Sequence, residues 1–217
     1  MIFIESVRMS ELNKFEEIGV YLKLSNVVFF YSEQFHKKLS KHFANASEIK
    51  SVYHITLYQG RIEQQDMKNV YSNVGEAATV QKPFLISMKP HLNKVGNNIF
   101  WEADSDNVEL QNLHEKLLTS IFPFKSGTLQ QFQNLDFANA ADDSTVGDIK
   151  IYGMANVKKR YNPHVTVAYQ VGEKSLTSEL SKANAVNFLA ESIGVGRIGY
   201  YGNVIEELAT FKFLIGH

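Results

Sequence analysis

The feature that most constrains this chain is a short motif that occurs twice, 110 positions apart. The first copy is His54-Ile55-Thr56-Leu57 and the second is His164-Val165-Thr166-Val167. β-Branched and aromatic residues surround both copies, which predicts strands. Alternate side chains of a strand point to the same side, so each histidine shares a face with its threonine and the apolar residues face the other way. Each strand can therefore line a cleft with one face and pack against a core with the other.

Two histidines facing each other across a cleft are suited to acid–base chemistry on a phosphodiester. The unperturbed pKa of histidine, about 6.5, allows both protonation states near neutral pH. A neutral imidazole can take a proton from water while an imidazolium gives a proton to the leaving oxygen. Threonine hydroxyls can donate hydrogen bonds to the non-bridging phosphate oxygens, where negative charge builds up in the transition state. The predicted catalytic residues, with no metal, are His54, Thr56, His164 and Thr166.

A single histidine in a strand is more often a hydrogen-bonded structural residue, so neither copy alone identifies a site. The chain has seven histidines, and none of the other five is followed two positions later by threonine. Chance alone would produce such a triplet less than once in a chain of this composition. The occurrence of two copies, both in strand-like surroundings, therefore favours a functional pair.

Composition narrows the class of partner. The chain has 22 Lys and Arg against 23 Asp and Glu, a net charge of −1, so nothing favours an extended nucleic-acid duplex. A small phosphorylated ligand suits this charge balance better than duplex DNA does. The absence of cysteine excludes disulfides and a thiol nucleophile. The sequence shows no secretory signal and no apolar run long enough for a membrane span, so we expect a cytoplasmic protein that binds no membrane. We also expect a monomer that needs no cofactor.

Residue patterns predict alternating strands and helices. The predicted strands are 18–24, 52–58, 84–88, 99–101, 162–169, 185–193 and 204–214. The predicted helices run from Ser32 to about Asn45, over 63–78, from Asp106 to about Ile121, and over 176–182. These elements divide into two comparable halves, each built around one His-Thr strand. The pattern is typical of an α+β fold with two sheets covered by helices.

The stretch 123–150 interrupts this pattern. It is rich in Gln, Asn, Asp, Ser and Gly and has weak periodicity, which predicts a long irregular excursion. Lys158, Lys159 and Arg160 follow it and precede the second motif, where they could steer a phosphate, although a basic turn is more often only solvated. His114 lies on the apolar-striped helix before the excursion, and we expect it to be structural.

The paired motifs resemble the signature of the 2H phosphoesterase superfamily, which includes RNA 2′,3′-cyclic phosphodiesterases and the 2′-5′ RNA ligase-like proteins. Asn162-Pro163 is similar to the lead-in common before the second motif of that family. Ile99-Phe100-Trp101 with the helix after it resembles the family's mid-chain strand and helix, and 199–213 resembles its closing strand. The resemblance spans roughly residues 15–215, with 123–158 unmatched.

This resemblance implies a single bilobal domain over residues 1–217, with two antiparallel sheets in pseudo-twofold symmetry, outer helices and a central cleft lined by the His-Thr strands. It implies a metal-independent phosphodiesterase whose substrate is a small nucleotide or an RNA end, and which opens 2′,3′-cyclic phosphates or cleaves 2′-5′ bonds. His54 and His164 would be the acid–base pair. Tyr169 matches an aromatic that holds the base or sugar in family members, and Tyr58, which shares the parity of His54, is a weaker substrate-binding candidate.

Two alternative functions stay open at this level: a non-catalytic module that binds nucleotides or RNA ends in the same cleft, and a ligase-like or protein-partner role mediated by the excursion at 123–150. Pure binding does not require a matched acid–base pair, so the two intact histidines favour the enzyme. Within the enzyme hypothesis, the motifs leave open which histidine is the general base, whether the product carries a 2′- or a 3′-phosphate, and which substrate is natural.

Overall fold

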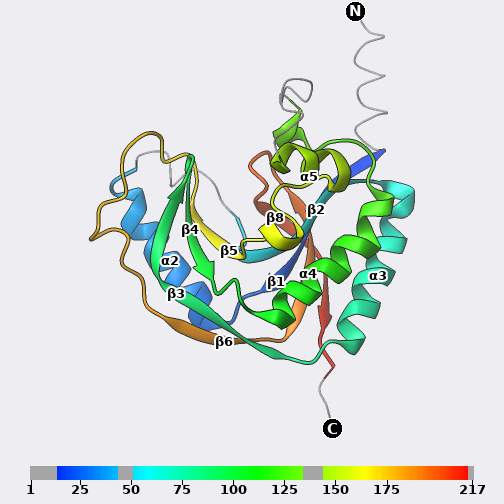
Figure 1. Ribbon diagram of the computed structural model, residues 1–217, viewed down its shortest axis with the longest axis horizontal. Coiled ribbons are helices and arrows are strands. Elements are labelled where there is room, and N and C mark those ends of the chain that lie inside the picture. Colours follow the sequence, from blue (N-terminus) through cyan, green and yellow to red (C-terminus); the bar gives the residue numbers. More distant parts are fainter. Residues whose placement is uncertain (1–13, 44–50, 134–143, 215–217) are drawn as a thin grey trace, which may run out of the picture.

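The computed structural model describes residues 14–43, 51–133 and 144–214, which form two four-stranded antiparallel sheets (Figure 1). The first sheet contains β1 (Phe15–Lys23), β2 (His54–Glu63), β7 (Ser192–Ile198) and β8 (Val204–Lys212), in the order β2-β1-β7-β8. The second contains β3 (Phe84–Val95), β4 (Asn98–Ala103), β5 (His164–Ala168) and β6 (Val186–Ala190), in the order β5-β4-β3-β6. The predicted α+β class is confirmed.

Each sheet carries one His-Thr strand at an edge, and these two edges meet. β2 is an outer strand of the first sheet and β5 is an outer strand of the second. The two strands contact each other across the junction between the sheets. This equivalent placement confirms the predicted bilobal arrangement and brings the motif faces to one cavity.

The alternation of elements predicted one sheet from each half of the chain. The two sheets are not made in this way. β7 and β8, late in the sequence, return to the first sheet, where β7 pairs with β1. β3 and β4, from the first half, belong to the second sheet, where β4 pairs with β5. Strand partners depend on contacts between segments far apart in the chain, which local patterns do not encode.

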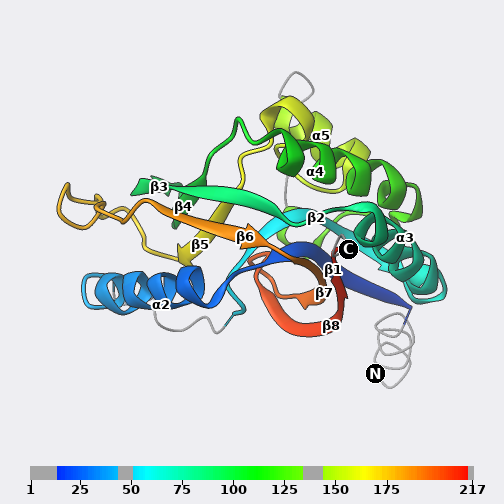
Figure 2. The same ribbon diagram turned by 90° about the horizontal axis from the view of Figure 1, so that it is seen from below.

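Three helices cover the outer faces of the sheets. α2 (Asn26–Ser40) lies against the second sheet through β5 and β6, with the Phe35 ring 5.0 Å from that of Trp101 in an edge-to-face contact. α3 (Met67–Val80) and α4 (Val108–Ile121) pack on each other and on the first sheet. Figure 2 shows α2 beneath the second sheet, with α3 and α4 side by side away from it.

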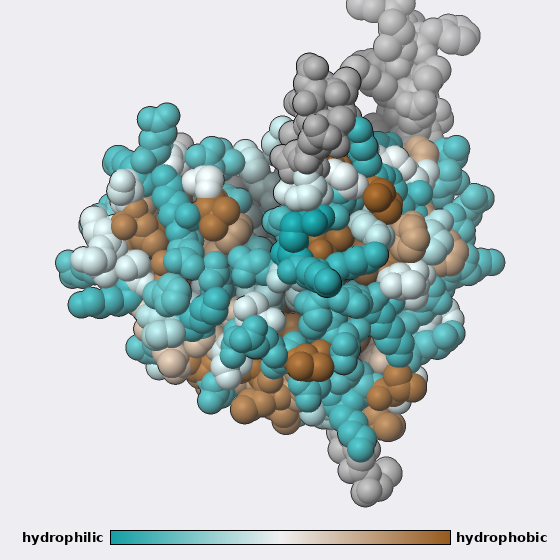
Figure 3. Space-filling view, viewed as in Figure 1, coloured by the Kyte–Doolittle hydropathy of each residue, from teal (hydrophilic) through white to brown (hydrophobic). Residues whose placement is uncertain are grey.

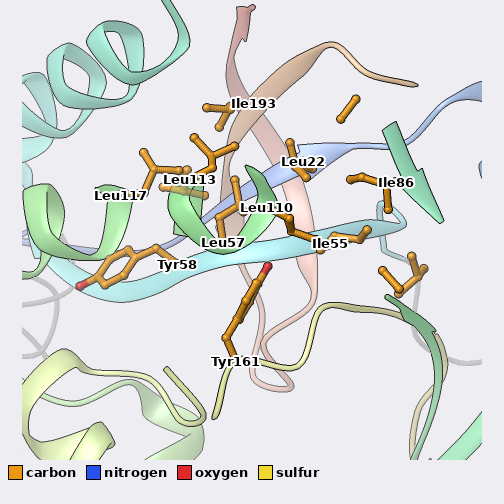
Figure 4. Packing of buried hydrophobic residues seen from close by; sticks show 14 of the residues in the cluster. Leu22, Ile55, Leu57, Tyr58, Ile86, Leu110, Leu113, Leu117, Tyr161 and Ile193 are labelled. Atoms are coloured by element: carbon orange, nitrogen blue, oxygen red, sulfur yellow. The ribbon is translucent and has the colours of Figure 1, made fainter. Parts of the chain in front are cut away.

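The apolar faces of the motif strands are buried beneath these helices, as their parity predicted. Ile55 and Leu57 on β2 are fully buried (Figure 4). The facing stripe of α4 consists of Leu110, Leu113, Leu117 and Leu118. Burying each such side chain stabilises the fold by about 1.5–3 kcal/mol. Burial on this side holds the histidines and threonines toward the cleft.

Two helices begin at residues other than those predicted. α2 starts several residues earlier, because Ser25 is its N-cap and accepts a hydrogen bond from the Val28 amide. Ser32, the predicted cap, lies inside the helix and donates to the Val28 carbonyl. α4 is capped by Asn107 rather than Asp106, through a 2.9 Å hydrogen bond from the Leu110 amide. The predicted helix at 176–182 is absent, since these residues form turns.

The excursion at 123–150 is more ordered than predicted in the parts that are described, and residues 134–143 lie outside them. It contains short 3-10 helices at Phe122–Phe124 and Gln130–Phe132, and the helix α5 (Ser144–Tyr152). The face over α4 and α5 is mostly hydrophilic in Figure 3. Of the helices described, none has both the length and the apolar character required to span a membrane.

Candidate active site

The two motif histidines are held by the same local hydrogen bond. The Nδ1 atom of His54 lies 2.6 Å from the carbonyl oxygen of Val52, and that of His164 lies 2.7 Å from the carbonyl oxygen of Asn162. A carbonyl oxygen only accepts, so Nδ1 carries the proton in both rings. This fixes the tautomer and leaves Nε2 of each ring as the nitrogen that can accept a proton. In each motif, the backbone carbonyl two residues before the histidine orients the imidazole ring.

The structure brings the four predicted catalytic side chains to one cavity of about 220 Å³. His54 and Thr56 reach it from β2, and His164 and Thr166 reach it from β5. His54 is only 7% exposed, and proximity to His164 disfavours its protonation. The two rings therefore interact electrostatically, as a pair that shares one phosphate would.

The charge environments of the two histidines differ. Burial lowers the pKa of His54 to about 4, against a hydrogen bond to the Val52 carbonyl that acts to raise it. Burial also lowers the pKa of His164, but here the negative charge of Glu102 opposes the shift, together with the Asn162 carbonyl. His54 has no carboxylate in that role. The imidazolium form is thus better supported at His164 than at His54.

Glu102 is positioned by the ladder between β4 and β5, in which it pairs with His164. Burial acts to raise the pKa of Glu102, but hydrogen bonds from Asn93, Lys89 and Asn162 outweigh it, so the pKa is lowered and the carboxylate is ionised. Two residues earlier on β4, the ring of Phe100 stacks on that of His164 with centroids 3.7 Å apart. One strand therefore supplies both the charge partner and the packing surface for this imidazole.

A β-bulge in β2 shapes the cavity and explains the position of Tyr58. In the ladder between β1 and β2, Val20 pairs with Tyr58 and Tyr21 pairs with Thr56, so Leu57 is an extra residue. The bulge reverses the alternation beyond Thr56. Tyr58 consequently points into the core, where it is fully buried among the apolar residues of Figure 4 and does not line the cavity. The structure does not bring Tyr58 to the predicted substrate-binding position.

Gln59 lines the cavity in the place that strict alternation assigned to Tyr58. The bulge places Gln59 rather than Tyr58 in the cavity, because the extra residue moves Gln59 to the strand face of Thr56. The sequence carried no signal for the extra residue.

Two buried side chains hold β2 at the bulge. His114 on α4 donates from Nδ1 to the Leu57 carbonyl at 2.7 Å and accepts at Nε2 from the Lys158 amide at 3.1 Å. Tyr161 stacks on the His114 ring with centroids 3.9 Å apart, and its hydroxyl donates to the Thr56 carbonyl at 2.7 Å. His114 is therefore the structural residue that its helix position predicted, and it acts directly behind the first motif.

Tyr169 lies in the cavity wall, where it is 5% exposed. Burial raises the pKa of its hydroxyl to about 12, while hydrogen bonds with the side chains of Thr166 and Ser51 act to lower it. The hydroxyl therefore stays protonated at neutral pH and is held beside the second-motif threonine. The sequence resemblance predicted that Tyr169, just beyond the second motif, would lie where the substrate binds.

The basic cluster before the second motif is used elsewhere. Lys158 donates to the hydroxyl of Tyr152 on α5 at 2.5 Å. Arg160 forms an ion pair with the buried carboxylate of Asp148 and donates to the Ser144 carbonyl. Lys159 is exposed, and none of the three lines the cavity. The structure does not bring them to the phosphate position, and two of them anchor α5 instead.

Sequence reasoning missed several cavity residues that come from other segments. They are Gln59, Asn98, Phe100, Phe132, Asn156, Tyr161 and Tyr201. Phe100 and Asn98 could have been inferred from the strand next to the second motif. Gln59 depends on the β2 bulge, and the others come from the excursion, from the segment between α5 and β5 and from the β7–β8 turn, which carry no motif.

No group of three or more histidine or carboxylate side chains lies close enough to hold a metal ion in the ranges 14–43, 51–133 and 144–214. The cavity presents neutral oxygen and nitrogen donors and two imidazoles. The chemistry that these side chains can supply is proton transfer and hydrogen bonding.

Acid will destabilise this protein through its buried histidines. His54, His114 and His164 all have lowered pKa values, with burial as the main cause. These histidines bind protons near pH 6.5 in the unfolded chain but not in the folded chain. The free energy of unfolding therefore decreases as the pH falls from about 6.5 toward the folded pKa. With a folded pKa of about 4, His54 alone removes about 2 kcal/mol between pH 6.5 and 5. Urea unfolding at these two pH values measures this, and equal free energies of unfolding would contradict it.

Comparison with solved structures identifies the fold as that of LigT of E. coli and of TT0787 of Thermus thermophilus, the bilobal α+β fold that the sequence resemblance implied. The structure matches LigT of E. coli in complex with NADP+ with a TM-score of 0.60 and 12% identity, over 92% of this chain and 99% of that chain. It matches TT0787 of Thermus thermophilus with a TM-score of 0.56 and 14% identity, over 93% and 100%.

A third structure, described as a phosphoesterase, matches with a TM-score of 0.59 and 12% identity, over 92% of this chain and 99% of that chain. No protein-family profile and no curated protein sequence matches the chain. At these identities the similarity establishes the fold, and the coverage of both chains is nearly complete.

Proposed function

We propose that this protein is a 2H phosphoesterase: a metal-independent phosphodiesterase that acts on 2′,3′-cyclic phosphates or 2′-5′ phosphodiester bonds of nucleotides or RNA ends. One observation carries the proposal. Two histidines with the same Nδ1–carbonyl hydrogen bond line one cavity, each with a threonine on its own strand face. A binding module has no need of two imidazoles with matched tautomers.

The charges around the two imidazole rings indicate which histidine is the general base and which is the general acid. His54, with a pKa of about 4, is neutral at pH 7, and its Nε2 can accept a proton; we assign it as the general base. His164 faces the ionised Glu102, which favours the imidazolium, and we assign it as the general acid. Both transfers use Nε2, because Nδ1 is committed to a carbonyl.

Hydrolysis of a 2′,3′-cyclic phosphate would then proceed in line. His54 Nε2 takes a proton from water as the water oxygen bonds to phosphorus. The bond from phosphorus to one ribose oxygen breaks, and His164 Nε2–H gives that oxygen its proton. Thr56 and Thr166 donate to the non-bridging oxygens, and Tyr169, held beside Thr166, is the proposed contact with the sugar or base. Each proton transfer contributes roughly 10²–10⁴-fold in rate.

The structures of similar fold support a nucleotide as the substrate class. LigT of E. coli has been crystallised with NADP+, ATP, 3′-AMP and phosphate. These ligands share a phosphate and most carry an adenosine. The present cavity combines imidazoles and threonines from the motif strands with aromatic and amide side chains from other segments, which suits the same combination.

The direct test is hydrolysis of the four nucleoside 2′,3′-cyclic phosphates and of 2′-5′ oligoadenylate, each with and without EDTA. We expect turnover of at least one substrate at a rate that EDTA does not change. Loss of activity on chelation would contradict the mechanism. Tight binding of nucleotides without turnover across this panel would favour the non-catalytic module instead.

Replacing Glu102 by glutamine should move the alkaline limb of the pH–rate profile to lower pH. Its carboxylate acts to raise the pKa of His164, and the general acid works only while it is protonated. Removing the negative charge lowers this pKa further, so the rate begins to fall at a lower pH. Lys89→Gln is the matched control, since it removes the 3.2 Å ion-pair partner of Glu102 but keeps the carboxylate. Profiles of kcat/KM against pH measure the shift, and an unmoved limb in E102Q would exclude this role.

A further inference from the structure

A second wall of the cavity is built from two segments that belong to neither motif. Phe132 comes from the short 3-10 helix at Gln130–Phe132, and Tyr201 comes from the turn between β7 and β8. Phe132 packs on a small buried cluster that contains Tyr21 and Leu129. Tyr201 is 41% exposed, with its ring edge-on to that of Tyr200. Phe132 and Tyr201 therefore bring two aromatic rings to the lining of a cavity that is otherwise largely polar.

Gln59 ties these two segments to the catalytic strand. Its side-chain amide donates to the Gly202 carbonyl at 2.6 Å and accepts from Gln131 at 3.4 Å. Gly202, with φ of +73°, sits in a turn closed by its own amide on the Gly199 carbonyl. Gln59 reaches this position only because of the β2 bulge. The positions of Phe132 and Tyr201 are therefore set by the same strand that carries His54.

The chemistry of this wall suits a nucleobase. Aromatic faces stack on any base, and such stacking contributes about 1–3 kcal/mol per base. Side-chain amides can pair with the hydrogen-bonding edge of a base that is not paired in a duplex. Gln59, Asn98 and Asn156 supply amides on the cavity lining. A ribose phosphate without a base would leave the aromatic rings unused.

The charge of the cavity limits the number of phosphates. Among the described residues that line it, none is a lysine, an arginine, an aspartate or a glutamate. Lys158 is engaged with Tyr152, Arg160 with Asp148, and Lys89 with Glu102. A polynucleotide strand or a polyphosphate is normally held by several lysine or arginine side chains. The two imidazoles here match one phosphate.

We propose, resting on the function proposed above, that the substrate is a single nucleoside 2′,3′-cyclic phosphate, with its base against Phe132 and Tyr201, rather than a polyphosphate or the end of an RNA strand. The cyclic phosphate lies between the histidines, and the base extends toward the second wall.

The base-binding part is tested by Tyr201→Ala and Phe132→Ala, with Phe30→Ala as the matched control. Phe30 is an exposed aromatic residue on α2 and does not line the cavity. For adenosine 2′,3′-cyclic phosphate we expect KM to rise about 5- to 150-fold in the first two variants, the fold-change equivalent to the loss of one stacking contact. The effect on kcat should be smaller, and Phe30→Ala should match the wild type. Equal KM values in all four proteins would overturn the assignment.

Binding gives a readout that does not depend on turnover. Titration calorimetry with 2′-AMP and 3′-AMP, the two potential products, should show the same weakening of about 5- to 150-fold in the Tyr201 and Phe132 variants. Affinities that these substitutions leave unchanged would reject the wall as a base site, whether or not the protein is an enzyme.

The single-nucleotide part is tested by comparing that substrate with a short RNA ending in a 2′,3′-cyclic phosphate over a range of salt concentrations. We expect kcat/KM for the RNA to be no greater than for the mononucleotide, and both to change little with salt. A preference of more than about tenfold for the RNA, with a steep fall on adding salt, would overturn the inference and leave the phosphodiesterase intact. Absence of hydrolysis of both, with nucleotide binding retained, would instead contradict the proposed function.

Discussion

Replacing either His54 or His164 by alanine should lower kcat for hydrolysis of a 2′,3′-cyclic phosphate by about 10²–10⁴-fold, the range for loss of one general acid or base. Each ring is the only imidazole on its strand face, and each is aimed by a backbone carbonyl. The lining residues of the described chain offer no carboxylate or lysine to replace them. Steady-state rates with the best cyclic substrate measure the loss.

The double variant should be little slower than the slower single variant, because base and acid act in one step and their effects are not additive. His91→Ala is the control, since His91 is exposed and lies outside the cavity; its kcat should stay within about twofold of the wild type, as expected for a surface site. Urea unfolding of each variant shows that it is folded in the assay. Wild-type kcat in either motif variant would exclude the two-histidine mechanism.

The local part of the fold could be read from the sequence because it depends on strand periodicity. His54 and Thr56 share a face, and Ile55 and Leu57 are buried behind them, as alternation requires. The second motif obeys the same rule. A pattern of period two fixes which face is polar even when the strand's partners are unknown.

The same rule failed two residues later, at Tyr58. One extra residue in the ladder between β1 and β2 turned Tyr58 into the core and brought Gln59 to the cavity. A bulge is decided by pairing with β1 and by the groups that hold it, none of which is local in sequence. The base wall at Phe132 and Tyr201 was missed for a related reason, since it joins segments about 70 positions apart.

The basic cluster before the second motif has a role that the local sequence does not show. Arg160 and Lys158 stand just before the second motif, so a steering role was a reasonable hypothesis from position alone. The structure uses them to fasten α5, through Asp148 and Tyr152. A basic residue is free to bind phosphate only when no carboxylate or hydroxyl of its own chain is closer, and that depends on tertiary packing.

Replacing His114 by alanine should lower the free energy of unfolding by about 3–5 kcal/mol, as for other buried truncations that also break hydrogen bonds. The ring is fully buried, and its removal leaves the Leu57 carbonyl and the Lys158 amide without their partner. It also removes the surface on which Tyr161 stacks. Urea unfolding at a pH of about 7.5, above the lowered histidine pKa values, measures the loss. Lys116→Ala, two residues on and exposed, should change stability by no more than about 0.5 kcal/mol.

This loss should reach the chemistry, because His114 and Tyr161 hold the bulge from which Thr56 projects. Tyr161 donates to the Thr56 carbonyl and His114 donates to that of Leu57, so loosening both displaces the proposed phosphate ligand Thr56 and the strand that carries the proposed general base. In folded H114A, kcat should therefore fall while KM changes less, since misplaced groups weaken the transition state more than initial binding. Thermal unfolding of the same samples confirms that the assayed protein is native. A destabilised variant with wild-type kcat would mean that the bulge holds its geometry without His114, and that Tyr161 alone positions Thr56.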